Sequence, residues 1–227
     1  MKKVTVVLLS MLLVLAMGQA VFAKGSVGLT AGYSGTVSGG SGFASGLNVG
    51  ISGDYYLINR LSLAGGASLG VAFIKNSTTS TTALSLNANL FVKYDIVQIS
   101  ILSGLLKLGA QAGVIYDRVL TGPFAFQRNA LFLALGVYAD AYVTSKINIY
   151  ADLKFPLGLF DFVAGDSHGA FFEKFFYNVK IGATYAVSPK INVGIECGIS
   201  NTNIISALMK SDSIYKFSVG AKVGYIF

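Results

Sequence analysis

The chain has 227 residues, of which 53% are hydrophobic and only 12% are charged. In a water-soluble domain about a quarter of the residues are usually charged, so this composition points to a lipid environment. Beyond the N-terminal region no apolar run is long enough for a membrane-spanning helix, which leaves a closed β-barrel as the spanning structure. The net charge of +7 is dispersed and forms no basic run with interleaved aromatic residues, which argues against nucleic acid as a partner.

The first element is a predicted secretory signal peptide over residues 1–23. Lys2 and Lys3 form its basic start, an apolar stretch follows, and Ala23 is a small residue at the expected cleavage site. A single anchoring helix is the alternative interpretation. The rest of the chain, residues 24–227, is expected to form one outer-membrane β-barrel domain.

Ten segments of alternating polarity follow, which predicts strands with one apolar and one polar face. The expected strands cover residues 25–33, 42–54, 61–74, 83–95, 97–116, 130–143, 147–160, 175–187, 191–200 and 214–227. The fourth and fifth are expected to meet at a turn around Ile96, with a β-bulge near Ser103 and Gly104 where the parity shifts. The predicted fold class is all-β, a transmembrane antiparallel up-and-down β-barrel of about ten strands. In an eight-stranded alternative, the glycine-rich segment 25–54 is unpaired or plugs the lumen.

Charged side chains fall on the less apolar face of the predicted strands, which we assign to the lumen. The lumen-lining residues expected on this ground are Lys93, Asp95, Asp140, Asp152, Lys154, Lys180, Glu196, Lys216 and Lys222. A basic residue on the lipid face would cost about 2–4 kcal/mol at the bilayer midplane, whereas a water-soluble barrel would carry its charges outside. Neighbouring opposite charges predict a buried ion network, with the pairs Lys93–Asp95, Asp152–Lys154 and Lys180–Glu196.

The same polar face is rich in glycine, which leaves space inside the barrel. Barrels of about eight strands are normally filled by side chains, and ten strands with a glycine-rich wall leave two interpretations open: a filled, non-conducting lumen, or a narrow polar pore or ligand cavity. In a passage, the excess of lysine over acidic residues predicts a slight preference for anions.

Aromatic residues gather towards both ends of the apolar faces, as the two membrane–water interfaces select. The predicted connections alternate between short turns and longer loops. Short turns on the periplasmic side and an even number of strands place the N- and C-termini in the periplasm.

In these features the chain resembles the small bacterial outer-membrane barrels of the OmpA, OmpX and OmpW types, over essentially the whole mature chain. Its last residues also resemble the C-terminal signal read by the barrel-assembly machinery, with Tyr225 and Phe227 as the signal residues, although Lys222 stands where that signal usually has glycine. The resemblance implies a monomer in the bacterial outer membrane. Its partners would be outer-membrane lipid and, during biogenesis, the barrel-assembly machinery.

Catalytic motifs are weak. His168, the only histidine, lies in Asp166-Ser167-His168 within a predicted long loop and resembles the Asp-x-His pair of omptin proteases. The loop over residues 75–82 lacks the carboxylates that this family places opposite the pair. The sequence has no zinc cluster, EF-hand loop or phosphate-binding loop, so we expect neither an enzyme nor a cofactor. The expected function is a structural barrel or a narrow passive pore for small polar solutes; the alternative is an adhesin or surface recognition protein that acts through its loops.

Overall fold

The computed structural model describes residues 25–38, 43–75, 80–101, 104–121, 126–163, 166–168, 176–201 and 214–227. The predicted signal peptide and several of the longer connections lie outside these residues. In the described part of the chain, no helix is long and apolar enough to cross a membrane.

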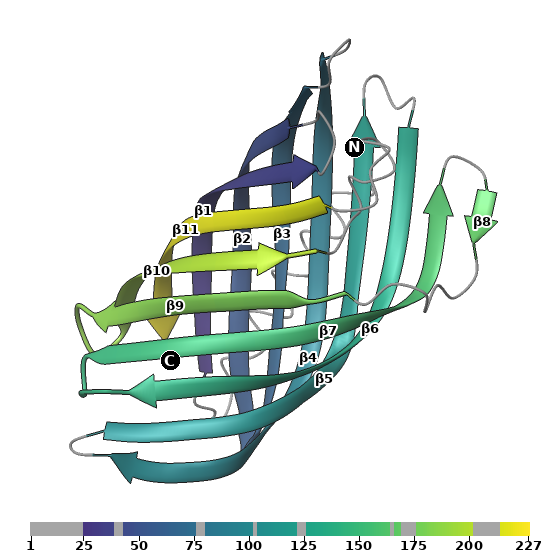
Figure 1. Ribbon diagram of the computed structural model, residues 1–227. Helices are drawn as coiled ribbons and strands as arrows, with labels where there is room; N and C mark the ends of the chain where they lie inside the picture. Colours follow the sequence, from purple (N-terminus) through teal and green to yellow (C-terminus); the bar gives the residue numbers. More distant parts are fainter. Residues whose placement is uncertain are drawn as a thin grey trace.

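Antiparallel strands form a closed barrel (Figure 1). The strands are β1 (Gly25–Ser38), β2 (Phe43–Ile58), β3 (Leu61–Lys75), β4 (Ser80–Ile101), β5 (Gly104–Thr121), β6 (Phe126–Tyr142), β7 (Ile147–Val163), β8 (Asp166–His168), β9 (Asn178–Ala186), β10 (Ile191–Ser200) and β11 (Ile214–Ile226). Each wall strand pairs with its neighbour in the chain, β7 pairs with β9, and β11 pairs with β1 to close the wall. The short β8 pairs only with the end of β7, so ten strands of the described chain form the wall.

The predicted ten-stranded barrel is therefore confirmed. The eight-stranded alternative is wrong because β1 and β2 are regular wall strands. Residues Val27–Val37 of β1 pair with β2 on one side and with β11 on the other. This double pairing satisfies the backbone N–H and C=O groups that lipid could not.

One predicted turn is wrong. The chain does not turn at Ile96. Strand β4 continues to Ile101, which pairs with Gly104 at the start of β5. The irregularity lies at Ile96 instead, where the pairing with β5 shifts register between Asp95 and Val97. Ile96 and Val97 are both exposed on the outside of the barrel, so the bulge places two consecutive apolar side chains on one face.

We name the two ends of the barrel by their connections. The turn end carries the short connections, such as those between β6 and β7 and between β9 and β10, and also both ends of the described chain. There Gly25 and Phe227 exchange two backbone hydrogen bonds, of 3.3 and 3.1 Å. The loop end is the opposite one, at which β7 continues into the small hairpin with β8 (Figure 1).

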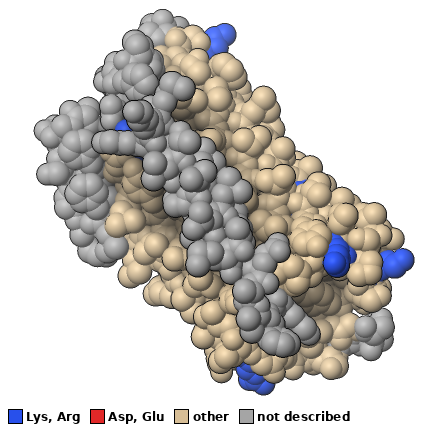
Figure 2. All heavy atoms as spheres, turned by 180° about the vertical axis from the view of Figure 1, so that it is seen from behind, with Lys and Arg blue, Asp and Glu red and all other residues tan. Residues whose placement is uncertain are grey.

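The outer face is apolar, and alternate residues along each strand point to it. Leu29, Leu47 and Ile195, for example, are each about two-thirds exposed. In the view of Figure 2, most described atoms belong to uncharged residues and no acidic side chain is visible. Exposed aromatic residues lie towards the loop end, at Phe43, Phe73 and Tyr215, and towards the turn end, at Tyr94, Tyr185, Tyr225 and Phe227. This outer surface suits a bilayer with two interfaces.

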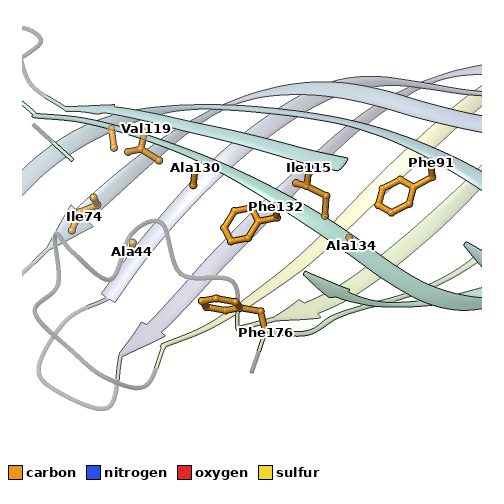
Figure 3. Packing of buried hydrophobic residues seen from close by; sticks show 10 residues of the cluster. Ala44, Ile74, Phe91, Ile115, Val119, Ala130, Phe132, Ala134 and Phe176 are labelled. Atoms are coloured by element: carbon orange, nitrogen blue, oxygen red, sulfur yellow. The ribbon is translucent and has the colours of Figure 1, made fainter. Parts of the chain in front are cut away.

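Buried apolar side chains form a cluster inside the barrel, towards the loop end (Figure 3). The cluster consists of Ala44, Ile74, Ala83, Phe91, Ile115, Val119, Ala130, Phe132, Ala134 and Phe176. Phe176 comes from the segment before β9, and its ring meets that of Phe132 edge to face, with centroids 5.8 Å apart. The loop-end half of the lumen is therefore packed on the β4–β6 side, and open volume is confined to the rest of the interior.

Candidate functional site

The lumen has two unlike walls. The inward positions of β11, β1, β2 and β3 carry mostly small residues, whereas those of β4 to β7 carry most of the large ones. The small residues that border the cavity are Thr30, Ser34, Gly50, Ser52, Gly66, Ser68, Gly70, Ser218 and Gly220. Because side-chain mass is concentrated on one wall, space remains along the other. We call these two sides the small-residue wall and the filled wall.

A cavity of about 650 Å³ occupies that space. Its lining reaches from Lys146 and Ile147 at the turn end to Thr36, Ala44 and Ser200 at the loop end. Such a volume lies within the range of sites that hold small molecules. The cavity is thus elongated along the barrel axis and is bordered by hydroxyl groups, glycine backbone and charged side chains.

The structure brings nearly all predicted lumen residues to this cavity. Its lining includes Lys93, Asp140, Asp152, Lys154, Lys180, Glu196, Lys216 and Lys222. Asp95 is not among the lining residues, and it is only 3% exposed. Tyr138 and Gln98 both donate hydrogen bonds to the Asp95 carboxylate, and Lys107 lies 3.5 Å from it.

Of the three predicted ion pairs, two are present and one is not. Lys154 lies 2.9 Å from Asp152, and Lys180 lies 3.0 Å from Glu196. The pairing of Lys93 with Asp95 is wrong, because the register shift at Ile96 brings Lys107 beside Asp95. The ammonium of Lys93 instead lies over the ring of Tyr138, 4.1 Å from its centroid, where a cation–π contact replaces the ion pair.

Two tyrosines cross a neighbouring strand at a glycine. Tyr138 of β6 lies over Gly109 of β5, and its hydroxyl donates to Asp95 of β4. Tyr150 of β7 lies over Gly182 of β9, and its hydroxyl donates to Glu196 of β10 at 2.9 Å. We call these arrangements the tyrosine bridges. A side chain at either glycine would overlap the ring, so each bridge requires glycine on its middle strand.

The two bridges are related by a local two-fold axis between β6 and β7. Ala139 pairs with Ala151 at the centre, while Tyr138 pairs with Asp152 and Asp140 with Tyr150. The same two-fold relation includes the glycines under the rings. A lysine lies two residues before each glycine, and it forms an ion pair with the carboxylate to which the tyrosine donates.

Sequence reasoning missed the bridges, although the sequence carries a signal for them. Tyr-Ala-Asp occurs at residues 138–140 and again at 150–152, and Lys-x-Gly occurs at 107–109 and 180–182. Further hydrogen bonds tie the filled wall, since Gln111 donates to Asp152 and Asn87 to Asp117. This wall is therefore a fixed network of charges rather than a set of mobile ones.

The structure places the backbone of His168, the candidate member of an Asp-x-His pair, in a short strand. This residue lies in β8, opposite Asp161 of β7, and so belongs to a hairpin rather than to an irregular loop. Among the residues described, no group of three or more His, Cys, Asp or Glu side chains is placed to hold a metal ion. Cys197 is exposed on the outer face of β10.

Comparisons with known proteins agree with this architecture. The sequence model described as outer membrane protein beta-barrel domain matches residues 4–227. No curated protein matches the chain significantly.

Solved barrels share the fold. The outer membrane protease OmpT from Escherichia coli has a TM-score of 0.54 at 14% identity, covering 90% of this chain and 96% of that one. The translocator domain of the autotransporter NalP from Neisseria meningitidis has a TM-score of 0.56 at 12% identity, covering 93% and 91%. The transport unit of the autotransporter AIDA-I from Escherichia coli has a TM-score of 0.50 at 10% identity, covering 90% of each chain. At these identities the likeness extends to the fold alone.

Proposed function

This chain belongs to the outer membrane protein β-barrel domain family, and we propose that it forms a narrow passive pore for small polar solutes. Membership of the family indicates a location in the bacterial outer membrane. The proposal concerns what the barrel does there.

The observation that supports a pore is the cavity along the small-residue wall. It extends between the two ends of the barrel, and glycine, serine and threonine border it over most of its length. A ten-stranded barrel is wider than the eight-stranded barrels that side chains fill completely. The large side chains of the filled wall occupy part of the wider lumen. The glycines of the small-residue wall leave the rest of the lumen open.

The chemistry of the lining supports polar solutes of small size. Hydroxyl groups of Thr30, Ser34 and Ser68 and the amide of Asn48 line the passage. Such groups can replace the hydrogen bonds that a solute gives up with water. The buried apolar cluster around Phe132 draws most of its members from β4 to β6, and Ala44 of β2 and Ile74 of β3 are its members on the small-residue wall.

The direct test is the conductance of the refolded mature chain, residues 24–227, in a planar lipid bilayer. Discrete and reproducible current steps are expected. Ser34→Phe and Ser68→Phe, which add bulk on the small-residue wall, should reduce the step size or abolish it. Leu69→Phe is the matched control, because Leu69 is the next residue along β3 but faces outward and is 61% exposed.

Two results would overturn the pore. One is a folded barrel that inserts but passes no current; it would turn attention to a structural role or to recognition by the loops. The other is an unchanged step size in both serine variants, which would place the conducting path elsewhere.

A further inference from the structure

The strands that close the barrel carry an unbalanced positive charge on their inner face. Strand β11 points Lys216 and Lys222 into the cavity. Neither β11 nor its partner β1 contains an aspartate or glutamate. We call the inward positions of β11 and β1 the basic seam.

Several lysines elsewhere inside the barrel are engaged by other side chains, and Lys93 lies over the Tyr138 ring. Lys154 and Lys180 each form an ion pair with a carboxylate, as does Lys107 outside the cavity lining. For Lys216 and Lys222, no carboxylate lies within 4.0 Å among the residues that the structure describes. The charges of Lys216 and Lys222 are therefore available to a solute in the cavity.

The acid on the adjacent strand is already engaged. Glu196 of β10 accepts one hydrogen bond from Lys180, at 3.0 Å, and another from Tyr150, at 2.9 Å. Lys222 lies further off, with its ammonium 5.9 Å from the centroid of the Tyr150 ring. Glu196 lies opposite Gly220 of β11 and its charge also acts on Lys222, but both of its hydrogen bonds go to Lys180 and Tyr150 and none to the basic seam.

Hydroxyl groups and glycines surround the two lysines. Lys222 pairs with Thr30 across the seam, and Lys216 pairs with Thr36 and with Ser200 of β10. The stem of Lys222 runs over Gly28, with its Cε 2.8 Å from the position that a Cβ would occupy. The glycine makes room for the stem on the strand surface. An ammonium with hydroxyl neighbours is a suitable environment for the oxygens of a small anion.

We propose that the basic seam makes the lumen an anion path, with Lys216 as the site towards the loop end and Lys222 as a second site further in. The two lie six residues apart on one strand, about 20 Å along it. Two separate sites of single charge bind an anion strongly enough for entry and weakly enough for release. The ligand class is the small anion, namely chloride, phosphate or sulfate. This inference rests on the proposed pore.

The test is the reversal potential under a potassium chloride gradient for the refolded chain and for Lys216→Gln, Lys222→Gln and the double variant. The parent protein should prefer chloride. A unit positive charge about 4 Å from a permeating ion raises the local concentration of chloride about fivefold in water and lowers that of potassium about fivefold, so each variant should lower the chloride-to-potassium permeability ratio by up to about 25-fold. Added inorganic phosphate or sulfate should reduce the chloride current of the parent, and less so that of the double variant.

Two further variants separate this charge effect from structural damage. Lys222→Arg keeps the charge and should keep the selectivity. Lys190→Gln removes a charge from the turn between β9 and β10, outside the cavity lining, and should leave the permeability ratio unchanged.

The two proposals fail in different ways. A current that prefers potassium, or one whose selectivity the double variant does not alter, overturns the anion path and leaves the pore standing. The absence of any current from inserted barrels overturns the pore, and the anion path with it.

Discussion

Tyr150 reaches Glu196 across an intervening strand, and its hydroxyl lies 2.9 Å from the carboxylate. One side chain thereby ties β7, β9 and β10 together, and Tyr138 does the same for β6, β5 and β4. Adjacent strands of a barrel are ordinarily joined by the backbone ladder and by neighbouring side chains. The tyrosine bridges add links between strands that do not pair with each other.

Removing a bridging hydroxyl should destabilise the barrel. Tyr138→Phe removes a hydrogen bond to the buried Asp95 carboxylate, and bonds to charged groups contribute about 1.5–3 kcal/mol. Tyr150→Phe should cost less, since Glu196 borders the cavity whereas Asp95 is buried. The measurement is urea unfolding of the barrel in lipid vesicles, followed by circular dichroism. Tyr94→Phe on the outer face is the control, and an equal effect of Tyr94→Phe and Tyr138→Phe would show that the bridge contributes nothing.

The glycine beneath each ring should be energetically coupled to the tyrosine. Gly182→Ala places a methyl group against the Tyr150 ring and should cost about 1–3 kcal/mol, typical of overpacking. Part of this cost should disappear in a Tyr150→Ala background, and a double-mutant cycle measures that part. Gly65→Ala, where the nearest atom is 3.2 Å from the new methyl group, serves as the reference. Strict additivity of Gly182→Ala and Tyr150→Ala would contradict the geometry of the bridge.

A lysine should be tolerated inside the barrel and not outside it. Leu135 faces outward near the middle of β6 and is 51% exposed. Leu135→Lys should reduce the stability of the inserted barrel by about 2–4 kcal/mol, because the charge would enter the hydrocarbon region. Ser68→Lys, directed into the cavity, should have a much smaller effect. The comparison uses urea titration of both variants in vesicles, and a similar loss in both would argue against a lipid-facing outer surface.

Cysteine accessibility should separate the two faces. Cys197 lies on the outer face of β10, opposite Val219 of β11. In vesicles it should react with a lipid-soluble maleimide and resist a charged, water-soluble thiosulfonate. In a Cys197→Ser background, Ser52→Cys should show the reverse preference, and its modification should lower any conductance. Rapid modification of Cys197 by the charged reagent would mean that this surface contacts water.

Most of the wall could be predicted from alternation, because each face of a strand meets a single environment. The expected turn at Ile96 failed for a definable reason. Two consecutive outward residues, Ile96 and Val97, break the alternation, and the same break results from a turn or from a bulge. Only the residues that pair with Ile96 and Val97 distinguish a turn from a bulge. The sequence of this segment alone does not show which residues of the next strand it pairs with.

The side-chain network was less predictable than the wall. Asp152 and Lys154 share a strand and a face, so their pairing follows from local geometry. The partner of Asp95 depends on the register between β4 and β5, and the bulge changes that register. Each tyrosine bridge spans three strands, so it depends on the register of two strand pairs. The repeated Tyr-Ala-Asp is visible in the sequence, but its meaning becomes clear only when the pairing of the strands is known.

The composition of β1 also affects how the first strand aligns with the last strand to close the barrel. This strand has no charged residue, so no ion pair of its own can fix its alignment with β11. Two of its glycines face side chains of β11, since Gly28 faces Lys222 and Gly35 faces Phe217, and Gly25 faces Phe227, the residue after β11. A slip of two residues would preserve the inside and outside faces but would bring these large side chains against residues that already carry a Cβ. The alignment of the first strand with the last is thus specified by steric fit and does not depend on an ion pair of β1.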